Sequence, residues 1–265
     1  MTILDDIILN KKKEVRQRKK ALPLESRPPR PPLPRRDFKA ALSGDGLAVI
    51  AEIKFKSPSR GKIRKSGDPA GIAVGFERCG AAAVSVLTDR TYFDGRLEDL
   101  VRVKQVVRIP VLRKDFIFDP YQIYEANNGG ADAVLLIKRL LDRQQLEELL
   151  ACARELGLDS LVEVHDEREL EEVLCTSADI IGINNRDLST LAVDLRTSLR
   201  LVEQIPGRCV AVSESGIRTI RDLRLLRRAG FDAVLIGSAL MKSMSPALRL
   251  HALTAGLRKR SGDGR

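Results

Sequence analysis

Residues 47–61 read LAVIAEIKFKSPSRG, an apolar run whose character changes at Glu52. Side chains alternate along a β-strand, so Ile50, Glu52 and Lys54 are expected to share one face. Isolated buried charges are strongly disfavoured, and these two charges therefore need each other, a ligand, or both. The segment predicts a buried strand whose end faces a binding site, followed by a loop suited to cover a ligand. An edge strand with solvated charges is the alternative interpretation.

The same design recurs along the rest of the chain. Short runs rich in Val, Ile and Ala alternate with amphipathic stretches, which is typical of parallel βα units. The expected strands are residues 48–54, 82–87, 110–114, 133–137, 160–164, 180–184, 210–214 and 233–236. The main expected helices are residues 69–79, 97–107, 120–128, 143–156, 167–174, 195–204, 220–229 and 246–257. This alternation, with no GxGxxG fingerprint after the first strand, favours an α/β fold of the closed (β/α)8 type, a TIM barrel, over a doubly wound sheet.

Residues 1–46 are expected to form a helical extension ahead of the barrel. Apolar residues at helical spacing predict an amphipathic helix over residues 2–20, and a second, short helix precedes the first strand. Residues 22–36 are rich in Pro and Arg, which predicts an extended connector. The barrel would then span residues 47–258, and residues 259–265 would form a tail.

The composition indicates a cytoplasmic globular protein with an anionic partner. The four cysteines are scattered without a CxxC pair, which argues against zinc and disulfides and suits a reducing compartment. No apolar run approaches the ~18 residues of a membrane span, and no secretory signal is evident. The net charge of +10 favours anionic ligands, whereas an aromatic content of 4% makes nucleic acid a weaker candidate. We expect a monomer, with a dimer as the alternative.

Polar residues collect at the carboxyl ends of the expected strands, where barrels of this kind carry their active sites. Each shares its parity with apolar residues earlier in its strand, as Lys114 does with Leu112, so each is expected to point inward. Charges at the same end of several strands are hard to explain as structural ion pairs. The candidates are Glu52, Lys54, Lys114, Glu163, Asn184 and Glu214.

The last two strands carry a second feature. Strand 210–214 runs into Ser215 and Gly216, and strand 233–236 runs into Gly237 and Ser238. Glycines there let backbone N–H groups approach an anion, and barrels of this kind often hold phosphate at this position. The pair of Gly-Ser turns predicts a phosphate site.

Several segments resemble the indole-3-glycerol phosphate synthase family. They are residues 51–61, 87–89, 92–95, 110–116, 119–126, 161–165, 183–188 and 213–217. The resemblance runs from the N-terminal helix to Met241 and beyond, and the combined motifs are highly specific. The sequence departs from the family pattern in two places. Asn127 stands where the family often has an arginine, and the connector is unusually rich in Pro and Arg. Both departures concern surface and linker details, not the predicted site.

The resemblance implies a carboxy-lyase of tryptophan biosynthesis. Its substrate is 1-(2-carboxyphenylamino)-1-deoxyribulose 5-phosphate, and its products are indole-3-glycerol phosphate, carbon dioxide and water. It implies no metal and no organic cofactor. Partners are therefore expected to be limited to a small anionic substrate, without membrane.

The resemblance also implies roles for the strand-end residues. Attack of the aromatic ring on the sugar ketone needs the developing oxyanion to be protonated, a step assigned to Lys114. Loss of water needs an acid and a base, with Glu163 as the leading candidate and Lys54 as an acid in that step. Glu52 and Glu214 would hold the lysines and stabilise the cationic ring intermediate. How Lys54, Lys114 and Glu163 divide the acid and base roles stays open.

The remaining implied residues bind and orient the substrate. Asn184 would orient the reacting groups, and Arg186 would lie near the carboxylate that leaves. Apolar residues would form a slot for the aromatic ring and press its reacting carbon toward the ketone. The implied binding residues are Ser57, Phe93, Phe116, Leu135, Arg186 and Leu188.

Two alternative functions compete with this interpretation, and three residues near the candidate site are expected to have structural roles. Another sugar-phosphate barrel enzyme, such as phosphoribosylanthranilate isomerase, usually relies on a Cys–Asp pair, and no cysteine lies at a predicted catalytic strand end. A basic nucleic-acid-binding module using residues 11–36 would leave the barrel lysines unexplained. His165 is expected to pack or cap outside the barrel and is not assigned a catalytic role. Arg113 and Asp115 are expected to form a structural pair.

Overall fold

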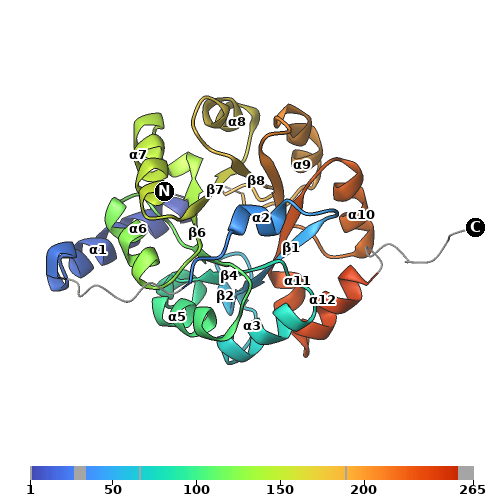
Figure 1. Ribbon diagram of the computed structural model, residues 1–265, viewed down its shortest axis with the longest axis horizontal. Coiled ribbons are helices and arrows are strands. Elements are labelled where there is room, and N and C mark those ends of the chain that lie inside the picture. The colour runs from blue at the N-terminus through green and yellow to red at the C-terminus, as the bar shows by residue number, and fades with distance from the viewer. Residues whose placement is uncertain (1, 27–33, 66, 189, 256–265) are drawn as a thin grey trace, which may run out of the picture.

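The computed structural model describes residues 2–26, 34–65, 67–188 and 190–255, and its strands close into a parallel barrel (Figure 1). The order around the barrel is β1-β10-β9-β8-β7-β6-β5-β4, and β4 pairs again with β1, where Ala83 is opposite Ile50. The strands are β1 (Ala48–Ile53), β4 (Ala83–Leu87), β5 (Val111–Lys114), β6 (Ala133–Ile137), β7 (Asp159–Val164), β8 (Ile180–Asn184), β9 (Val210–Glu214) and β10 (Ala233–Ile236). The predicted TIM barrel is confirmed.

Helices ring the outside of the barrel (Figure 1) and bury their apolar faces against it. Side-chain caps mark where they begin. Asp142 and Thr219 form capping boxes at α7 and α10. The helices are α1 (Ile3–Ala21), α2 (Phe38–Leu42), α3 (Pro69–Arg78), α4 (Arg90–Phe93), α5 (Leu97–Val106), α6 (Pro120–Asn128), α7 (Arg143–Glu155), α8 (Glu167–Leu174), α9 (Arg196–Leu201), α10 (Ile220–Arg228), α11 (Ser238–Met241) and α12 (Pro246–Thr254). Short 3-10 turns are η1 (Leu24–Ser26), η2 (Lys138–Leu140) and η3 (Val202–Gln204).

The interior of the barrel is apolar at one end. Inward residues such as Ile50, Leu112 and Val212 form a core inside the ring of strands. Helix α2 covers the N-terminal ends of the strands and adds Phe38 and Leu42 to that core (Figure 1). Because this end is packed shut, the C-terminal ends of the strands form the open end of the barrel, and the site lies there.

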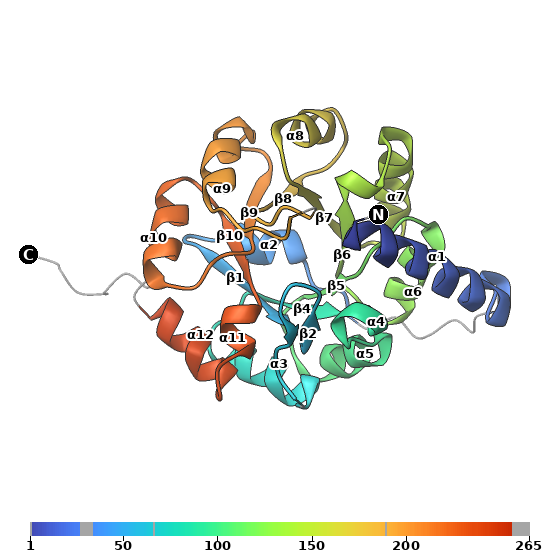
Figure 2. The ribbon, with the colours of Figure 1, turned by 180° about the vertical axis from the view of Figure 1, so that it is seen from behind.

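The N-terminal helix α1 packs against the flank of the barrel beside α6 (Figure 2). Arg18 reaches Glu125 of α6 at 3.1 Å, and buried Lys11 reaches Asp89 and Asp115 at 2.7 and 3.0 Å. These contacts tie the extension to the ends of β4 and β5. The extension is thereby held next to the strand that carries Lys114.

The barrel strands begin and end within one residue of the predicted positions. The other differences between the prediction and the structure concern short elements. The stretch after β1 forms a small hairpin, β2 (Lys56–Ser57) and β3 (Gly61–Lys62), instead of an irregular loop. Part of the Pro/Arg-rich connector, residues 27–33, and the predicted tail lie outside the described residues, and the domain limits stay predictions. No helix among the described residues is long and apolar enough to cross a membrane.

Candidate active site

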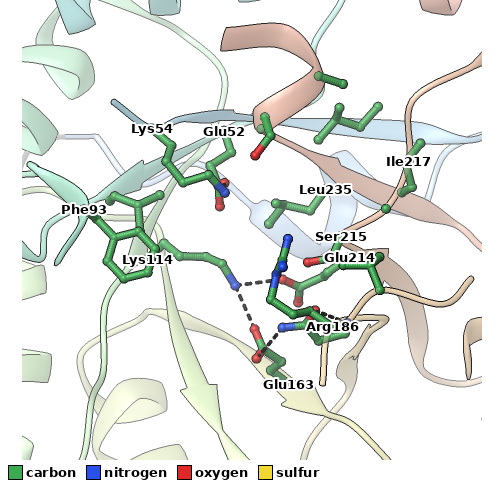
Figure 3. A pocket seen from close by; sticks show the side chains of 18 of the residues that line it. Glu52, Lys54, Phe93, Lys114, Glu163, Arg186, Glu214, Ser215, Ile217 and Leu235 are labelled. Carbon is green, nitrogen blue, oxygen red and sulfur yellow. Dashed lines mark hydrogen bonds and ion pairs between the residues drawn. The ribbon is translucent and has the colours of Figure 1, made fainter. Parts of the chain in front are cut away.

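A cavity of about 450 Å³ lies at the C-terminal ends of the strands. Its lining contains all of the predicted site residues except Ser57. Figure 3 shows the labelled side chains converging on it from β1, β5, β7, β9 and β10, from α4, and from the loops after β1, β8 and β9. Ser57 is buried in the hairpin strand β2 and does not line this cavity. The strand-end parity argument therefore placed its residues correctly, while their chemical roles stay predictions.

Lys114 is held between two carboxylates from other strands (Figure 3). Its Nζ lies 2.8 Å from Oε2 of Glu163 and 2.7 Å from Oε2 of Glu214. Burial disfavours the ammonium, but Glu163, Glu214 and Glu52 more than offset it and raise the pKa of Lys114. Lys114 is therefore a cation at neutral pH, with its charge directed into the cavity.

The two carboxylates on Lys114 differ in their surroundings. Burial opposes the charge on Glu163, yet Lys114 and His165 outweigh it and lower the pKa of Glu163. Asn184 donates a further hydrogen bond to Glu163 at 2.9 Å. Burial, reinforced by the charge of Glu163, raises the pKa of Glu214 to about 7 despite Lys114. Such a split between neighbouring carboxylates is how one site provides both a base and an acid at neutral pH.

Lys54 and Glu52 form a second ion pair at the end of β1. Glu52 is buried, whereas Lys54 reaches the cavity. Space for these carboxylates comes from glycines on neighbouring strands. A Cβ at Gly237 would collide with Glu52, and one at Gly182 would collide with Glu214. Gly237, predicted for phosphate binding, therefore also makes room for a buried carboxylate.

Apolar side chains form one wall of the cavity. The rings of Phe93 and Phe116 lie 5.9 Å apart at a 43° tilt, an arrangement that favours aromatic contact. Leu135 and Leu188 line the same cavity. Such a wall suits a flat apolar ligand, which is what the family resemblance implied.

The opposite rim of the cavity is formed by small residues and a basic side chain. Ser215 and Gly216 both have positive φ values, 66° and 83°, and turn the chain sharply after β9. Ser238 lies at the start of α11 and lines the cavity together with these residues. Arg186 also reaches the rim and is anchored by donating to the Leu191 carbonyl at 2.9 Å. This rim suits an anion.

Sequence reasoning missed four cations around the cavity. They are Arg60, Arg218, Lys242 and Arg249. Two of them carried a signal, because Arg60 belongs to the quoted stretch after β1 and Arg218 follows the Ser215 turn. The other two come from α11, α12 and their connection, and no motif marks them.

The structure corrects the placement of His165. Its Nε2 lies 3.2 Å from Oε1 of Glu163, so its ring packs against an inward-pointing candidate residue instead of outside the barrel. Residues two apart in a strand point the same way, and the sequence contained that signal. The structural pair is confirmed, with Arg113 3.1 Å from Asp115 and both buried.

No group of three or more His, Cys, Asp or Glu side chains within the described ranges is placed to hold a metal ion. The polar groups of the cavity are lysines, arginines, carboxylates, an amide and hydroxyls. This set suits a substrate with carboxylate and phosphate groups.

Comparison with known proteins identifies the family. The family model described as indole-3-glycerol phosphate synthase matches residues 4–253. The chain belongs to the indole-3-glycerol phosphate synthase family. The family predicted from the sequence is thus confirmed, together with its lyase and decarboxylase character and its place in tryptophan biosynthesis.

Relatives in this family cover nearly the whole chain. The indole-3-glycerol phosphate synthase of Desulfotalea psychrophila is 47% identical over 243 residues, which are 91% of this chain and 94% of that protein. The one from Salinibacter ruber is 46% identical and covers 96% of each chain. Indole-3-glycerol phosphate synthase 1 of Streptomyces coelicolor is 44% identical, again over 96% of each.

Solved structures support the fold. The crystal structure of 3-hexulose-6-phosphate synthase matches with a TM-score of 0.66, over 80% of this chain and 100% of that one. At 15% sequence identity this likeness shows the barrel alone.

Proposed function

We propose that this chain closes the indole ring of 1-(2-carboxyphenylamino)-1-deoxyribulose 5-phosphate at the mouth of the barrel, with Lys114 as the acid of the first step. The observation that carries the proposal is the buried ammonium of Lys114 between two carboxylates, beside an apolar slot and a basic rim. The isomerase alternative is not favoured, because the family match and the named relatives agree.

The substrate has an aromatic end, a reacting centre and a phosphate, and the cavity offers a matching wall for each. The slot around Phe93 and Phe116 takes the ring. Ser215, Gly216, Gly237 and Ser238 take the phosphate at the opposite rim. Arg186 accompanies the ring carboxylate, and the reacting ketone then lies over Lys114. Holding both reacting carbons in this way fixes the orientation that ring closure needs and so lowers the entropic part of its barrier.

Ring closure places negative charge on the former ketone oxygen, and Lys114 donates a proton to it. The pKa of Lys114 is raised by its carboxylate neighbours, so the proton is present before the substrate arrives. Carbon dioxide then leaves from the ring carbon that made the new bond, and its bonding electrons restore the aromatic ring. Glu52 balances the positive charge that precedes this loss, together with Glu214 in its ionised form.

Dehydration completes the reaction. The hydroxyl formed in the first step leaves as water with a proton from Lys54. Glu163 takes the proton from the neighbouring carbon, and the new double bond completes the pyrrole ring. Glu163 suits the base because its pKa is lowered by Lys114 and His165, despite burial. Asn184 holds Glu163 through its 2.9 Å hydrogen bond and orients it toward the substrate.

The test compares the purified chain with Lys114→Ala, using the deoxyribulose phosphate substrate without added metal and following indole fluorescence. We expect turnover by the parent and a loss of about 10² to 10⁴-fold in Lys114→Ala, the range typical of a general acid. Lys62→Ala, which changes an exposed lysine of β3, is the matched control.

Two outcomes would contradict parts of this proposal. Turnover that survives Lys114→Ala would keep the reaction and reject Lys114 as the acid. A folded parent that forms no indole product would reject the reaction itself. The cytoplasmic location and the monomeric state stay predictions from the sequence.

A further inference from the structure

His165 joins the candidate active site to charged groups outside it. It directly follows β7, and its ring is buried between two carboxylates. Nδ1 lies 3.0 Å from Oε2 of Glu169 on α8, and Nε2 lies 3.2 Å from Oε1 of Glu163. The Nε2 contact is an ion pair without the alignment of a hydrogen bond. No step proposed for the reaction transfers a proton to or from this ring.

The ring is positively charged at neutral pH. Burial lowers the pKa of His165, but Glu163 and Glu169 outweigh it and raise the value to about 9. An imidazolium has no lone pair with which to accept a proton. His165 therefore cannot relay a proton away from Glu163, and what it supplies is a fixed positive charge.

The charges around this ring form an alternating line. Successive nitrogen–oxygen distances along it are 2.6, 3.0, 3.2, 2.8 and 2.7 Å. The line runs through Arg139, Glu169, His165, Glu163, Lys114 and Glu214. Each interior member has a neighbour of opposite sign on both sides, and Glu214 is the terminal member.

Other charged groups also face His165, from a second cavity of about 360 Å³ that it lines. Asp166 lies 3.0 Å from Arg139, so Arg139 is shared between Asp166 and Glu169. The remaining charged residues around this cavity are Arg186, Asp187, Asp194 and Arg200. Because their signs are mixed, the nearest contacts of His165, with Glu163 and Glu169, decide its charge.

Position in the line makes the two carboxylates on Lys114 unequal. Glu163 lies between two cations and also accepts from Asn184. Glu214 has only the Lys114 ammonium, and its Oε1 has no hydrogen-bond partner among the described residues. A buried carboxylate with fewer cations and donors holds a proton more tightly.

We propose that His165 is a positioning residue whose positive charge keeps Glu163 ionised, so that Glu163 is the base and Glu214 is the carboxylate able to hold a proton. The inference rests on the proposed function of this site. Without the imidazolium, Glu163 and Glu214 would compete for one proton, and a fraction of the enzyme would have lost its base.

The experiment measures the pH dependence of kcat and KM for the parent and for His165→Gln, which retains a hydrogen-bond donor without the charge. We expect kcat at pH 5 to fall by about 10-fold and kcat at pH 7 to fall far less, while KM stays within about 3-fold. The acidic limb of the kcat profile should move up by about 1 to 2 pH units, and activity should recover toward the parent value at higher pH.

The chain contains only two histidines, His165 and His251, so NMR can follow the titration of each ring. His251→Gln, at an exposed position of α12, assigns the signals and is the matched control for activity. We expect His165 to stay protonated at pH 7. Glu169→Gln removes one carboxylate and should lower the pKa of His165 and shift the acidic limb in the same direction as His165→Gln.

The outcomes separate the inference from the function on which it rests. A neutral His165 at pH 7, an acidic limb unmoved by His165→Gln, or an equal loss of kcat at every pH would overturn the charge role while the parent still makes product. If His165→Gln does not fold, Glu169→Gln decides in its place, and an unchanged limb there overturns the inference. A parent inactive at every pH contradicts the proposed function instead.

Discussion

Two lysines in this molecule, Lys11 and Lys114, each hold two buried carboxylates, yet only one of them faces a cavity. Lys11 lies 2.7 Å from Asp89 and 3.0 Å from Asp115, and its side chain is 1% exposed. Lys114 has carboxylates at 2.8 and 2.7 Å, and its side chain is 13% exposed. Their charges and distances are nearly the same, so neither explains why one cluster is structural and the other a candidate for catalysis.

The difference lies in what else satisfies the carboxylates. Asp115 also accepts from the Thr88 hydroxyl at 2.6 Å, from Arg113 at 3.1 Å and from the Phe116 backbone at 2.9 Å. In the Lys114 cluster, Oε1 of Glu214 is buried beside Gly182 and has no hydrogen-bond partner among the residues described. The Lys11 cluster is closed by protein groups and clamps α1 to the barrel. Lys114 and both of its carboxylates line the cavity, where a ligand can contact them.

The largest effect that separates the two clusters is expected from Lys11→Met. Removing one partner of a buried ion pair typically costs about 3 to 5 kcal/mol, because an uncompensated charge is left behind. Asp89 would lose its ion-pair partner while Asp115 would keep Arg113, and the free energy of unfolding in denaturant should fall by about that amount. Activity per folded molecule should fall far less than in Lys114→Ala.

The matched control for Lys11→Met is Lys13→Met, an exposed lysine on the same helix. It should change the free energy of unfolding by less than about 0.5 kcal/mol. If Lys11→Met were as stable as this control, the closed cluster would not be the clamp on α1 that its geometry indicates.

The two clusters also show what sequence can predict. Lys114 was placed inside the barrel because it shares parity with Leu112 in a short apolar strand, and that period is a property of the backbone. The barrel itself followed from the regular alternation of such strands with helices. Arg113 and Asp115, at odd positions beside Lys114, were placed outside by the same reasoning, and the structure confirms their pairing.

What the sequence could not predict depends on contacts between distant segments. Lys11 belongs to a basic run on an amphipathic helix, and its burial follows from Asp89 and Asp115, which are far away in the chain. Lys242 and Arg249 reach the cavity only because α11 and α12 close the ring beside β1. Periodicity within one element contains no information about such neighbours.

The second effect, expected to be smaller, is the pH dependence of the free energy of unfolding that the proton on Glu214 causes. Its pKa is about 7 in the folded protein against a reference of 4.5, so between these values the folded state binds more protons than the unfolded state. The free energy of unfolding contributed by Glu214 must therefore fall as the pH rises from about 4.5 to 7. Glu214→Gln mimics the protonated form and should abolish this fall.

Denaturant unfolding of the parent and of Glu214→Gln at pH 5, 6, 7 and 8 measures this contribution. The two proteins should be nearly equal at pH 5, and the variant should gain on the parent by up to about 3 kcal/mol by pH 8, since one pKa unit is worth about 1.4 kcal/mol. A difference independent of pH would mean that Glu214 is ionised throughout, and the two carboxylates on Lys114 would then be alike.

The smallest effect is expected from Ser57→Ala, which tests whether an unpartnered buried oxygen is enough to mark a ligand site. Ser57 Oγ, like Glu214 Oε1, has no hydrogen-bond partner within the described chain, but Ser57 does not line the cavity. If cavity access is required, Ser57→Ala should change KM by less than about 3-fold, whereas Ser215→Ala, at the rim, should raise KM more. A larger rise for Ser57→Ala would show that the β2–β3 hairpin brings Ser57 to the substrate, as the sequence resemblance implied. Ser57 would then belong to the ligand site together with the residues around Lys114. An unpartnered buried oxygen would be enough to identify such a site, even where the ligand-free cavity does not reach it.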